Sequence, residues 1–294
     1  MAAVSASAPG VPEVPESEIA RRRTFRNRWY RTPSFVVGAT IVILLILAAI
    51  AAPLITRYDP NGQDLLHAYS HPSGAHWLGT DQLGRDVFTR LVFAGRSDLL
   101  IGFVAVLCPF CLGTLLGSLA GFYGGFVDTI VMRLVDVVVA FPFLVLVIAL
   151  VFVLGPGAES IIIAITAVGW VSYARIVRGE ILVQKRLDYV LAARAAGLSD
   201  ARIIGRHLLP NVITQAVVFS MSDIVLSILA IVTLGYLGLG LPPPTADWGS
   251  MASDGESLIT TQWQLTTFPG LAVVLTGLGL SLLGDGLADL LAPE

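Results

Sequence analysis

Charge and cysteine are both scarce in this sequence. Only 13% of its 294 residues are charged and 55% are hydrophobic, whereas a soluble globular chain carries roughly 25% charged residues. The formal net charge is −3, so the chain lacks the basic field with which a protein holds DNA or RNA. Its two cysteines cannot form a disulfide framework. These shortages argue against a soluble enzyme and against a nucleic-acid-binding protein.

Several chemical signatures are missing as well. No stretch reads GxxxxGKS or GxxxxGKT, the phosphate-binding loop of many ATPases, so the chain is not expected to hydrolyse ATP. The apolar segments offer only isolated polar side chains rather than a Ser–His or carboxylate pair, and they hold no repeated selectivity sequence. A stand-alone membrane enzyme or channel is therefore the less favoured class, and we assign no catalytic residue.

Long apolar runs dominate what remains. About 20 mostly apolar residues cross a bilayer as a helix, and six segments reach or approach that length. They cover residues 35–55, 99–119, 130–154, 161–177, 212–240 and 268–290. Because the runs are continuous rather than alternating, they predict helices and not a barrel. The sequence thus predicts an all-α integral membrane protein with six transmembrane helices.

The basic residues predict how the chain is oriented. With the N-terminus placed in the cytoplasm, 14 of the 18 Lys and Arg residues lie inside, as the positive-inside rule requires. We therefore expect both termini in the cytoplasm. Three parts follow: a partly disordered arm at 1–34, a first transmembrane helix with an outside segment at 35–98, and a five-helix core at 99–291. The core contains a long cytoplasmic loop at 178–211.

This loop has a pattern of its own. Good helix formers run from Glu180 to Ala196, and Gly197 is suited to end a helix with a positive φ. Ser199 can then cap a second short helix, which Leu209-Pro210 is expected to stop. The second helix would expose Ile203 and Ile204, and exposed apolar surface favours a docked partner over a solvated connector.

The same loop resembles the EAA loop of ABC importer permeases. Ala192-Ala193, Gly197 and Leu209-Pro210 stand at the spacing of that motif, although Leu191 replaces its usual Glu. The resemblance implies a coupling helix that docks on a cytoplasmic ATPase. The residues it assigns to coupling are Ala192, Ala193, Gly197, Leu198, Ser199, Asp200, Ile203, Ile204, His207, Leu209 and Pro210.

Further stretches narrow the resemblance. LGTDQLGRDVFTRL at 78–91, GFYGGFVDTIVMRLVDVVVAFP at 121–142 and LGLGLPPPTADWGSMASDG at 237–255 are similar to C-type permease subunits of the dipeptide, oligopeptide and nickel ABC importer family. GDGLADLLAP at 284–293 is a weaker version of that family's ending.

What the resemblance implies is a type I ABC importer fold in a prokaryotic cell membrane. The expected partners are a B-type permease subunit, two cytoplasmic ATPase domains that use ATP and Mg, an extracytoplasmic binding protein and the lipid bilayer. No nucleic acid is expected, and no cofactor in this chain. Such an importer moves di- or oligopeptides by alternating access. Import of nickel or another solute is the alternative.

The remaining site predictions concern single polar residues. Asp223 would line the translocation path near mid-bilayer, together with Asp136 and with Ile231, which matches a Glu of peptide permeases. A hydrogen-bonded packing role for Asp223, and an ion pair of Asp136 with Arg133, are the structural alternatives. The resemblance also suggests an outer-gate or binding-protein contact for Asp81, Arg85, Asp86 and Trp248.

Two candidate sites are judged less favourable. His67, His71 and His76 share a segment with several carboxylates, but Pro72, Ser73 and Gly74 prevent a helical alignment, so no metal site is assigned. Cys108 and Cys111 have CxxC spacing inside an apolar run, where thiolate formation is costly and a structural role is favoured. Glycines at 113, 117 and 121 predict a close seam between two helices.

Overall fold

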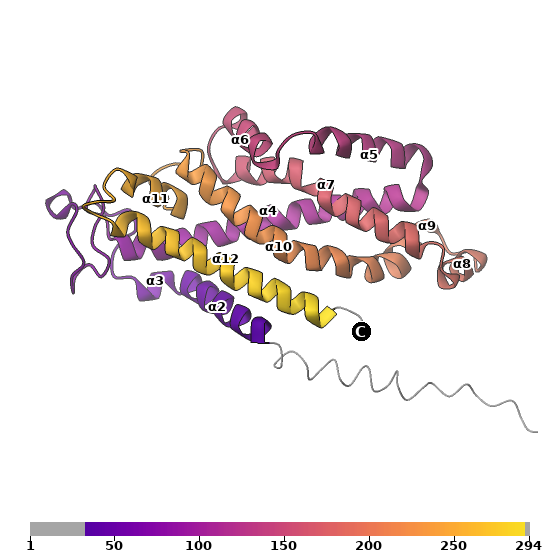
Figure 1. Cartoon of the computed structure of the whole chain (residues 1–294), viewed down its shortest axis with the longest axis horizontal. Helices are drawn as coiled ribbons and strands as arrows, with labels where there is room; N and C mark the ends of the chain where they lie inside the picture. The colour runs from indigo at the N-terminus through magenta and orange to yellow at the C-terminus, as the bar shows by residue number, and fades with distance from the viewer. Residues whose placement is uncertain (1–32, 292–294) are drawn as a thin grey trace, which may run out of the picture.

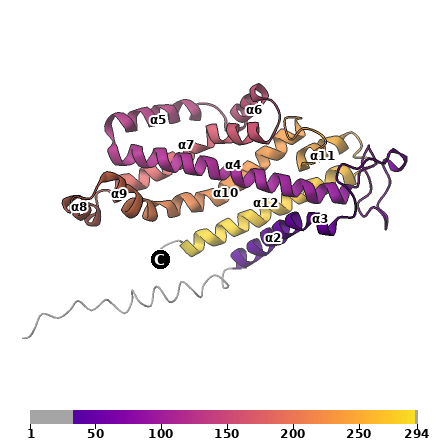
Figure 2. The same cartoon turned by 180° about the vertical axis from the view of Figure 1, so that it is seen from behind.

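The computed structural model describes residues 33–291, which form a long bundle of helices (Figures 1 and 2). Within that part of the chain no strand occurs, and a single bridge joins Thr80 to Asp86. The predicted arm at 1–34 lies almost entirely outside the described residues. The longer helices are α2 (Pro33–Ile50), α4 (Val87–Tyr123), α5 (Gly125–Val139), α6 (Phe143–Leu154), α7 (Ala158–Gln184), α10 (Leu209–Tyr236) and α12 (Gln264–Leu291).

Short helices lie at the two ends of the bundle. One end holds α8 (Asp188–Ala195), α9 (Asp200–Ile203) and a π-helical turn, η3 (Ile204–Leu208). The opposite end holds α3 (Ala52–Ile55), the 3₁₀ turn η2 (Leu65–His67), α11 (Trp248–Glu256) and the loops around them. We call these the α8 end and the α11 end. Both ends of the described chain lie toward the α8 end (Figure 1).

The structure confirms helices in all six apolar runs and corrects one of them. Among residues 33–291, five helices are long and apolar enough to cross a membrane. The predicted third span, 130–154, is instead two helices, α5 and α6, bent by 90° at a short break. The break falls at Pro142, which has no amide hydrogen to donate and keeps the residue before it out of the helical region. The pair counts as a sixth span only if both halves are taken together.

Several helices extend well beyond the apolar runs. α4 begins at Val87, twelve residues before the predicted span, because the Asp86 carboxylate accepts hydrogen bonds from the backbone amide and hydroxyl of Thr89, each at 2.8 Å. α7 likewise continues past its apolar run to Gln184. A run of apolar residues marks the part of a helix that lipid surrounds, whereas caps set where the helix ends.

The predicted glycine seam is confirmed between α4 and α7. A Cβ placed on Gly117 would lie 2.5 Å from the carbonyl oxygen of Ala174, and one on Gly121 would lie 3.0 Å from that of Arg178. One on Gly113 would overlap the carbonyl of Trp170. Only glycine allows two helix backbones to approach this closely, so these residues set the distance between α4 and α7.

Polar contacts extend the seam at the α8 end. Arg178 of α7 donates to both carboxylate oxygens of Asp128 on α5, with Nη2 at 2.6 Å from Oδ2. Lys185 Nζ donates to the carbonyl oxygen of Gly121 at 2.7 Å. The start of α5, the end of α4 and the end of α7 are thereby tied together.

We expect Gly117→Ala to destabilise the protein. The added methyl group would meet the α7 backbone, and overpacking of this kind typically costs about 1–3 kcal/mol. Gly179→Ala is the matched control, because a Cβ at Gly179 of α7 meets nothing within 4 Å. The midpoint of thermal unfolding in detergent should fall for Gly117→Ala and stay level or rise for Gly179→Ala. Equal midpoints for the two variants would contradict this account of the seam.

Candidate functional site

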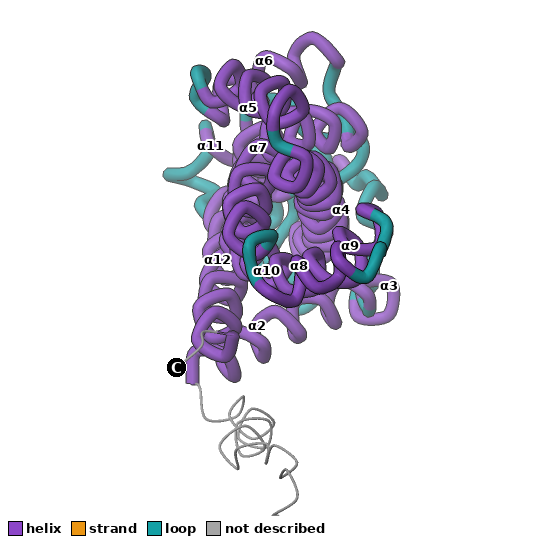
Figure 3. The backbone as a smooth tube through the Cα atoms, turned by 90° about the vertical axis from the view of Figure 1, so that its right-hand side faces the viewer, coloured by secondary structure: helices purple, strands orange, loops and turns teal. Residues whose placement is uncertain are grey.

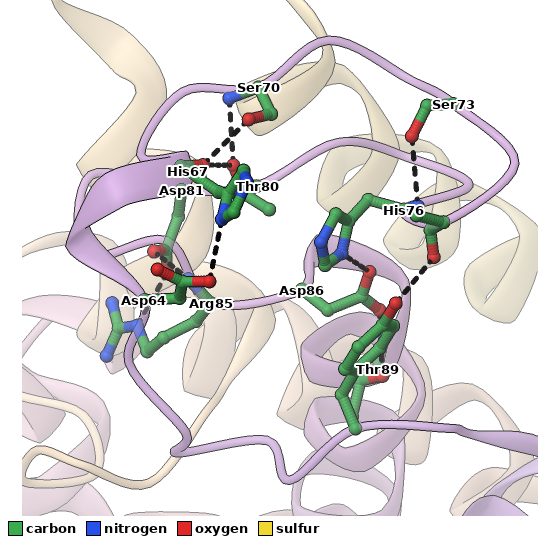
Figure 4. Close-up of polar contacts among 12 residues, drawn as sticks. Asp64, His67, Ser70, Ser73, His76, Thr80, Asp81, Arg85, Asp86 and Thr89 are labelled. Carbon is green, nitrogen blue, oxygen red and sulfur yellow. Dashed lines mark hydrogen bonds and ion pairs between the residues drawn. The ribbon is translucent and has the colours of Figure 1, made fainter.

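A network of buried charges occupies the α11 end (Figure 4). Asp81 Oδ1 accepts from the backbone amides of Leu83 and Arg85, and its Oδ2 accepts from Arg85 Nε at 2.6 Å. Arg90 Nε lies 3.5 Å from the same oxygen. One carboxylate thus neutralises two buried guanidinium groups and closes the turn that precedes α4.

A second carboxylate holds the neighbouring loop. Asp86, besides capping α4, lies 2.9 Å from Nδ1 of His76, which stacks on the ring of Tyr58. Trp248 begins α11, where its backbone amide donates to Asp98 Oδ2 at 2.9 Å and its indole donates to the carbonyl oxygen of Leu91 at 3.0 Å. These contacts join the segment at 56–86 and the start of α11 to the N-terminal part of α4.

The predicted contact with a binding protein is therefore corrected. Asp81, Arg85, Asp86 and Trp248 are all buried within this chain, because each satisfies a charge or a backbone group of the loops around α4. They offer no surface on which another protein could dock. Any part they play at a gate would come through the position of the loops and stays a prediction.

Asp98 is a further residue of this network, and no sequence pattern predicted it. This residue is fully buried in α4, and its Oδ1 has no hydrogen-bond partner among the described residues. It stands one position before the predicted span at 99–119, where a carboxylate is expected to lie in water at the end of a membrane helix. Its bond to Trp248 crosses 150 positions of sequence, and no local pattern indicates such a contact.

The three histidines do not converge. His67 Nδ1 lies 2.7 Å from Asp64 Oδ2, and that hydrogen bond lowers the pKa of the Asp64 carboxyl group. His76 pairs with Asp86 instead. Within residues 33–291 no group of three His, Cys, Asp or Glu side chains is placed to hold a metal ion. Cys108 and Cys111 are free thiols on α4.

Inside the bundle, Asp223 of α10 faces a neighbouring helix. The hydroxyl of Tyr173 on α7 donates to its Oδ2 at 2.7 Å, which is the hydrogen bond to another helix that the packing alternative anticipated. Asp223 is only partly buried, and no donor to its Oδ1 is found in the described part of the chain. The contact fixes Oδ2 and leaves Oδ1 able to accept a hydrogen bond from another group.

The other two predicted path residues differ from Asp223. Ile231 is 2% exposed and packs in a cluster with Ile101 and Val147, so its side chain is covered within this chain, and a place for it on the path stays a prediction. Asp136 is exposed on α5, where its Oδ2 lies 3.8 Å from Nη1 of Arg133. The proposed intrahelical pair is therefore present, and a place for Asp136 on the path stays a prediction.

At the α8 end, Gly197 ends α8 as predicted. Its φ is +76°, its amide donates to the carbonyl oxygen of Arg194 at 2.9 Å, and the amide of Leu198 donates to that of Ala193 at 3.2 Å. This pair of bonds is the Schellman motif, in which glycine is favoured because the left-handed region is open to it. The backbone then reverses and α9 begins after Ser199, whose side chain makes no capping bond.

The expected apolar docking face is not there. Ile203 is fully buried, Ile204 is nearly so, and both pack with Val190 and Ala193 of α8. The backbones of α8 and α9 lie side by side at this end of the bundle (Figure 3). The same cluster continues into Tyr173, Val177 and Ile181 of α7 and Val212 and Ala216 of α10. The apolar face of α9 is covered by the chain's own helices, and the exposed apolar side chains of this loop are instead Leu187, Tyr189 and Leu191, on or beside α8.

Two further details of the loop differ from expectation. α7 ends at Gln184 and α8 starts anew at Asp188, so residues 180–196 form no single helix. Leu209-Pro210 does not stop the second helix. Pro210 lies in the first turn of α10, directly after the π-helical turn η3, and a π turn is one of the adjustments by which a membrane helix accommodates a proline. α9, η3 and α10 follow one another without a break.

The exposed surface of this loop combines polar side chains with a few apolar ones on or beside α8. Arg194 is held over the ring of Phe122, with its guanidinium carbon 5.0 Å from the ring centroid. His207 and Leu209 are half-buried, as is Leu198. The exposed members of the predicted coupling set are Ala192, Gly197, Ser199, Asp200 and Pro210.

Two known protein families match separate stretches of this chain. The family described as "Binding-protein-dependent transport system inner membrane component" matches residues 113–294. The family described as "N-terminal TM domain of oligopeptide transport permease C" matches residues 20–72.

Curated relatives extend over most of the sequence. The chain is 42% identical over 260 residues to the oligopeptide transport system permease protein of Bacillus subtilis, which covers 88% of this chain and 85% of the relative. It is 40% identical over 263 residues to a probable D,D-dipeptide transport system permease protein of Escherichia coli, covering 90% and 88%. It is 41% identical over 273 residues to a glutathione transport system permease protein of Pectobacterium atrosepticum, covering 92% and 91%.

We expect Asp81→Ala to be strongly destabilising. Removing this carboxylate leaves Arg85 and Arg90 buried without their shared counter-charge, which typically costs about 3–5 kcal/mol. Asp254→Ala is the control, since Asp254 is partly exposed and lies 3.9 Å from Arg85. The yield of monodisperse protein and the thermal midpoint should fall sharply for Asp81→Ala alone. A loss of similar size in Asp254→Ala would show that the network does not depend on Asp81.

Proposed function

This chain belongs to the family of binding-protein-dependent transport system inner membrane components, and from that premise we propose that it is a C-type permease subunit of an ABC importer for di- or oligopeptides. The observation that carries the substrate is the agreement among relatives about 40% identical over most of the chain, which are named for oligopeptide, D,D-dipeptide and glutathione transport. The motif at the α8 end supports the same assignment.

The proposal includes partners. A B-type permease subunit would complete the translocation path, an extracytoplasmic binding protein would deliver the peptide, and two ATPase domains would bind ATP and Mg. This chain would then catalyse no reaction, which its lack of a phosphate-binding loop supports. Alternating access would follow from closure and separation of the ATPase domains.

We infer that the α8 end faces the cytoplasm. On the topology predicted from the sequence, 14 of the 18 Lys and Arg residues lie inside, as is typical of cytoplasmic segments, and the inside loop at 178–211 contains the short helices of the α8 end. Both termini would then be cytoplasmic, and α11 with the charged network would face outward.

In this proposal the α8–α9 hairpin receives the motion of the ATPase. Its exposed polar edge, at Gly197, Ser199 and Asp200, would contact the ATPase, whereas its buried face is continuous with α7 and α10 through Ile203 and Leu208. A hairpin packed in this way cannot move independently of the two helices, because its apolar cluster would have to open to water. Movement of the hairpin by a docked ATPase would therefore also displace α7 and α10 in the interior of the bundle.

Gly197→Val is expected to uncouple transport from ATP hydrolysis. A β-branched residue is strained at a φ of +76°, so the turn would reopen and redirect α9. Peptide uptake by the reconstituted complex should fall at least about tenfold, while ATP hydrolysis persists, if about 1–3 kcal/mol of strain is relieved by displacing the hairpin.

Gly205→Val is the matched control for that variant. Gly205 also has open space around its Cβ position but lies in η3 without a positive φ. It should retain most uptake. Full uptake by Gly197→Val in a complex of normal stoichiometry would refute the coupling role of the turn.

Asp223→Asn tests both the path and the substrate. The variant keeps the shape and the bond from Tyr173 but removes the charge that a peptide amino group would approach. We expect uptake of peptides with a free amino terminus to fall about tenfold, as is typical when one charged hydrogen bond is weakened by 1–2 kcal/mol. Uptake of N-acetylated peptides should change little.

Tyr173→Phe serves as the control, because it removes the hydrogen bond and leaves the carboxylate. Equal losses for both kinds of peptide in Asp223→Asn would assign Asp223 to packing alone. A wild-type complex that takes up nickel ions but neither kind of peptide would overturn the substrate assignment while leaving the permease assignment in place.

A further inference from the structure

A large apolar groove lies between α2, α4, α10 and α12, toward the α11 half of the bundle. Its volume is about 530 Å³, within the usual range of roughly 300–1,000 Å³ for ligand sites. Twelve of its 14 lining residues are apolar, and several of them, including Ile46, Leu100 and Phe103, are strongly exposed. The groove therefore opens sideways, toward the surroundings of the bundle, between α2 and α4.

One cation lies in this apolar lining. Arg96 of α4 is exposed, and no ion pair or hydrogen bond joins its side chain to any of residues 33–291. Among the described lining residues the one other polar residue, Thr276, already donates its hydroxyl to the carbonyl oxygen of Ala272. An arginine beside apolar residues at the end of a membrane span attracts an anionic partner, because a basic side chain near the membrane surface interacts favourably with anionic lipid headgroups.

The position of Arg96 along the bundle indicates the level of that partner. Arg96 is three residues before the apolar run that begins at Leu99, about 4.5 Å along the helix axis. Its neighbour Ala94 packs in one cluster with Leu265, in the first turn of α12. Arg96 is therefore near the membrane boundary at the α11 end, which is where lipid phosphates lie.

The rest of the groove runs away from that boundary into the apolar depth. On α2 its lining extends from Ile50 to Val42, about 12 Å along the axis, and on α12 it continues to Leu283. A site with one cation at its shallow end and only apolar walls below suits an amphiphile. A peptide would leave its amide groups without hydrogen-bond partners on such walls, which is unfavourable.

We propose that this groove binds one anionic glycerophospholipid, with the phosphate at Arg96 and an acyl chain between α2 and α4. The lipid would cover the exposed apolar face of α2, whose remaining contacts within this chain are chiefly with α12. The inference concerns lipid and not cargo, so it holds or fails independently of the peptide assignment.

The test uses the full chain in its purified transporter complex. The complex is placed in phosphatidylcholine nanodiscs that contain a minor fraction of phosphatidylglycerol, with a photoreactive benzoylphenylalanine in place of Leu100. Mass spectrometry then identifies what is cross-linked. We expect phosphatidylglycerol adducts about fivefold above its share of the nanodisc, since one basic side chain near anionic lipid contributes about 1 kcal/mol.

Three controls separate this site from general lipid contact. The same label in place of Phe152, exposed on α6, should show no enrichment. Arg96→Gln should abolish the enrichment at Leu100, and Arg96→Lys should retain it. Arg133→Gln, which removes another exposed arginine, should leave it unchanged.

Several results would overturn the proposal. Enrichment that survives Arg96→Gln would show that the arginine does not select the lipid. Cross-links mainly to a second polypeptide, or to an added peptide, would assign the groove to a subunit contact or to cargo. If Arg96→Gln failed to assemble, the wild-type protein would still decide the matter: absence of enrichment at low salt, or enrichment that high salt does not weaken, would contradict the proposal.

Discussion

The close approach of α4 to α7 is the contact on which the other helices depend. It is possible only because Gly113, Gly117 and Gly121 present bare backbone to α7. α7 in turn carries Arg178, which holds α5, and Tyr173, which contacts α10. In a bilayer, where apolar burial between helices gains little over lipid, such close packing and a few polar bonds are the main source of association.

The apolar runs and single glycines were sufficient to predict most of the architecture. They located all six helical regions, the seam of small residues and the positive φ of Gly197. They failed where an outcome depends on contacts distant in sequence. The sequence around Pro142 does not predict that α5 and α6 diverge by 90°. The sequence around Ile203 likewise does not predict that α7 covers its side chain.

Polar residues were the least predictable part of the site. Asp81, Arg85 and Asp86 stand in a segment rich in turn residues, which suggests exposure, yet they are buried because they neutralise one another and cap α4. Charged residues in a loop near a membrane therefore have two opposite explanations: they form a surface on which another protein docks, or they form ion pairs and helix caps within the chain. Only the atoms that each charged group contacts distinguish the two, and these atoms belong to loops distant in sequence.

The absence of a break between α9 and α10 has a mechanical consequence. From Asp200 to Tyr236 the chain is helical over 37 residues, about 55 Å at 1.5 Å per residue. Its far end packs on α11, where Gly235 and Gly249 are in close backbone contact. This helix is not a uniform rod, because the π-helical turn η3 and Pro210 lie near its start, and helices bend most readily at such features. Force applied beside Gly197 would thus reach the loops around Trp248 through one continuous helix that can bend at η3 and Pro210.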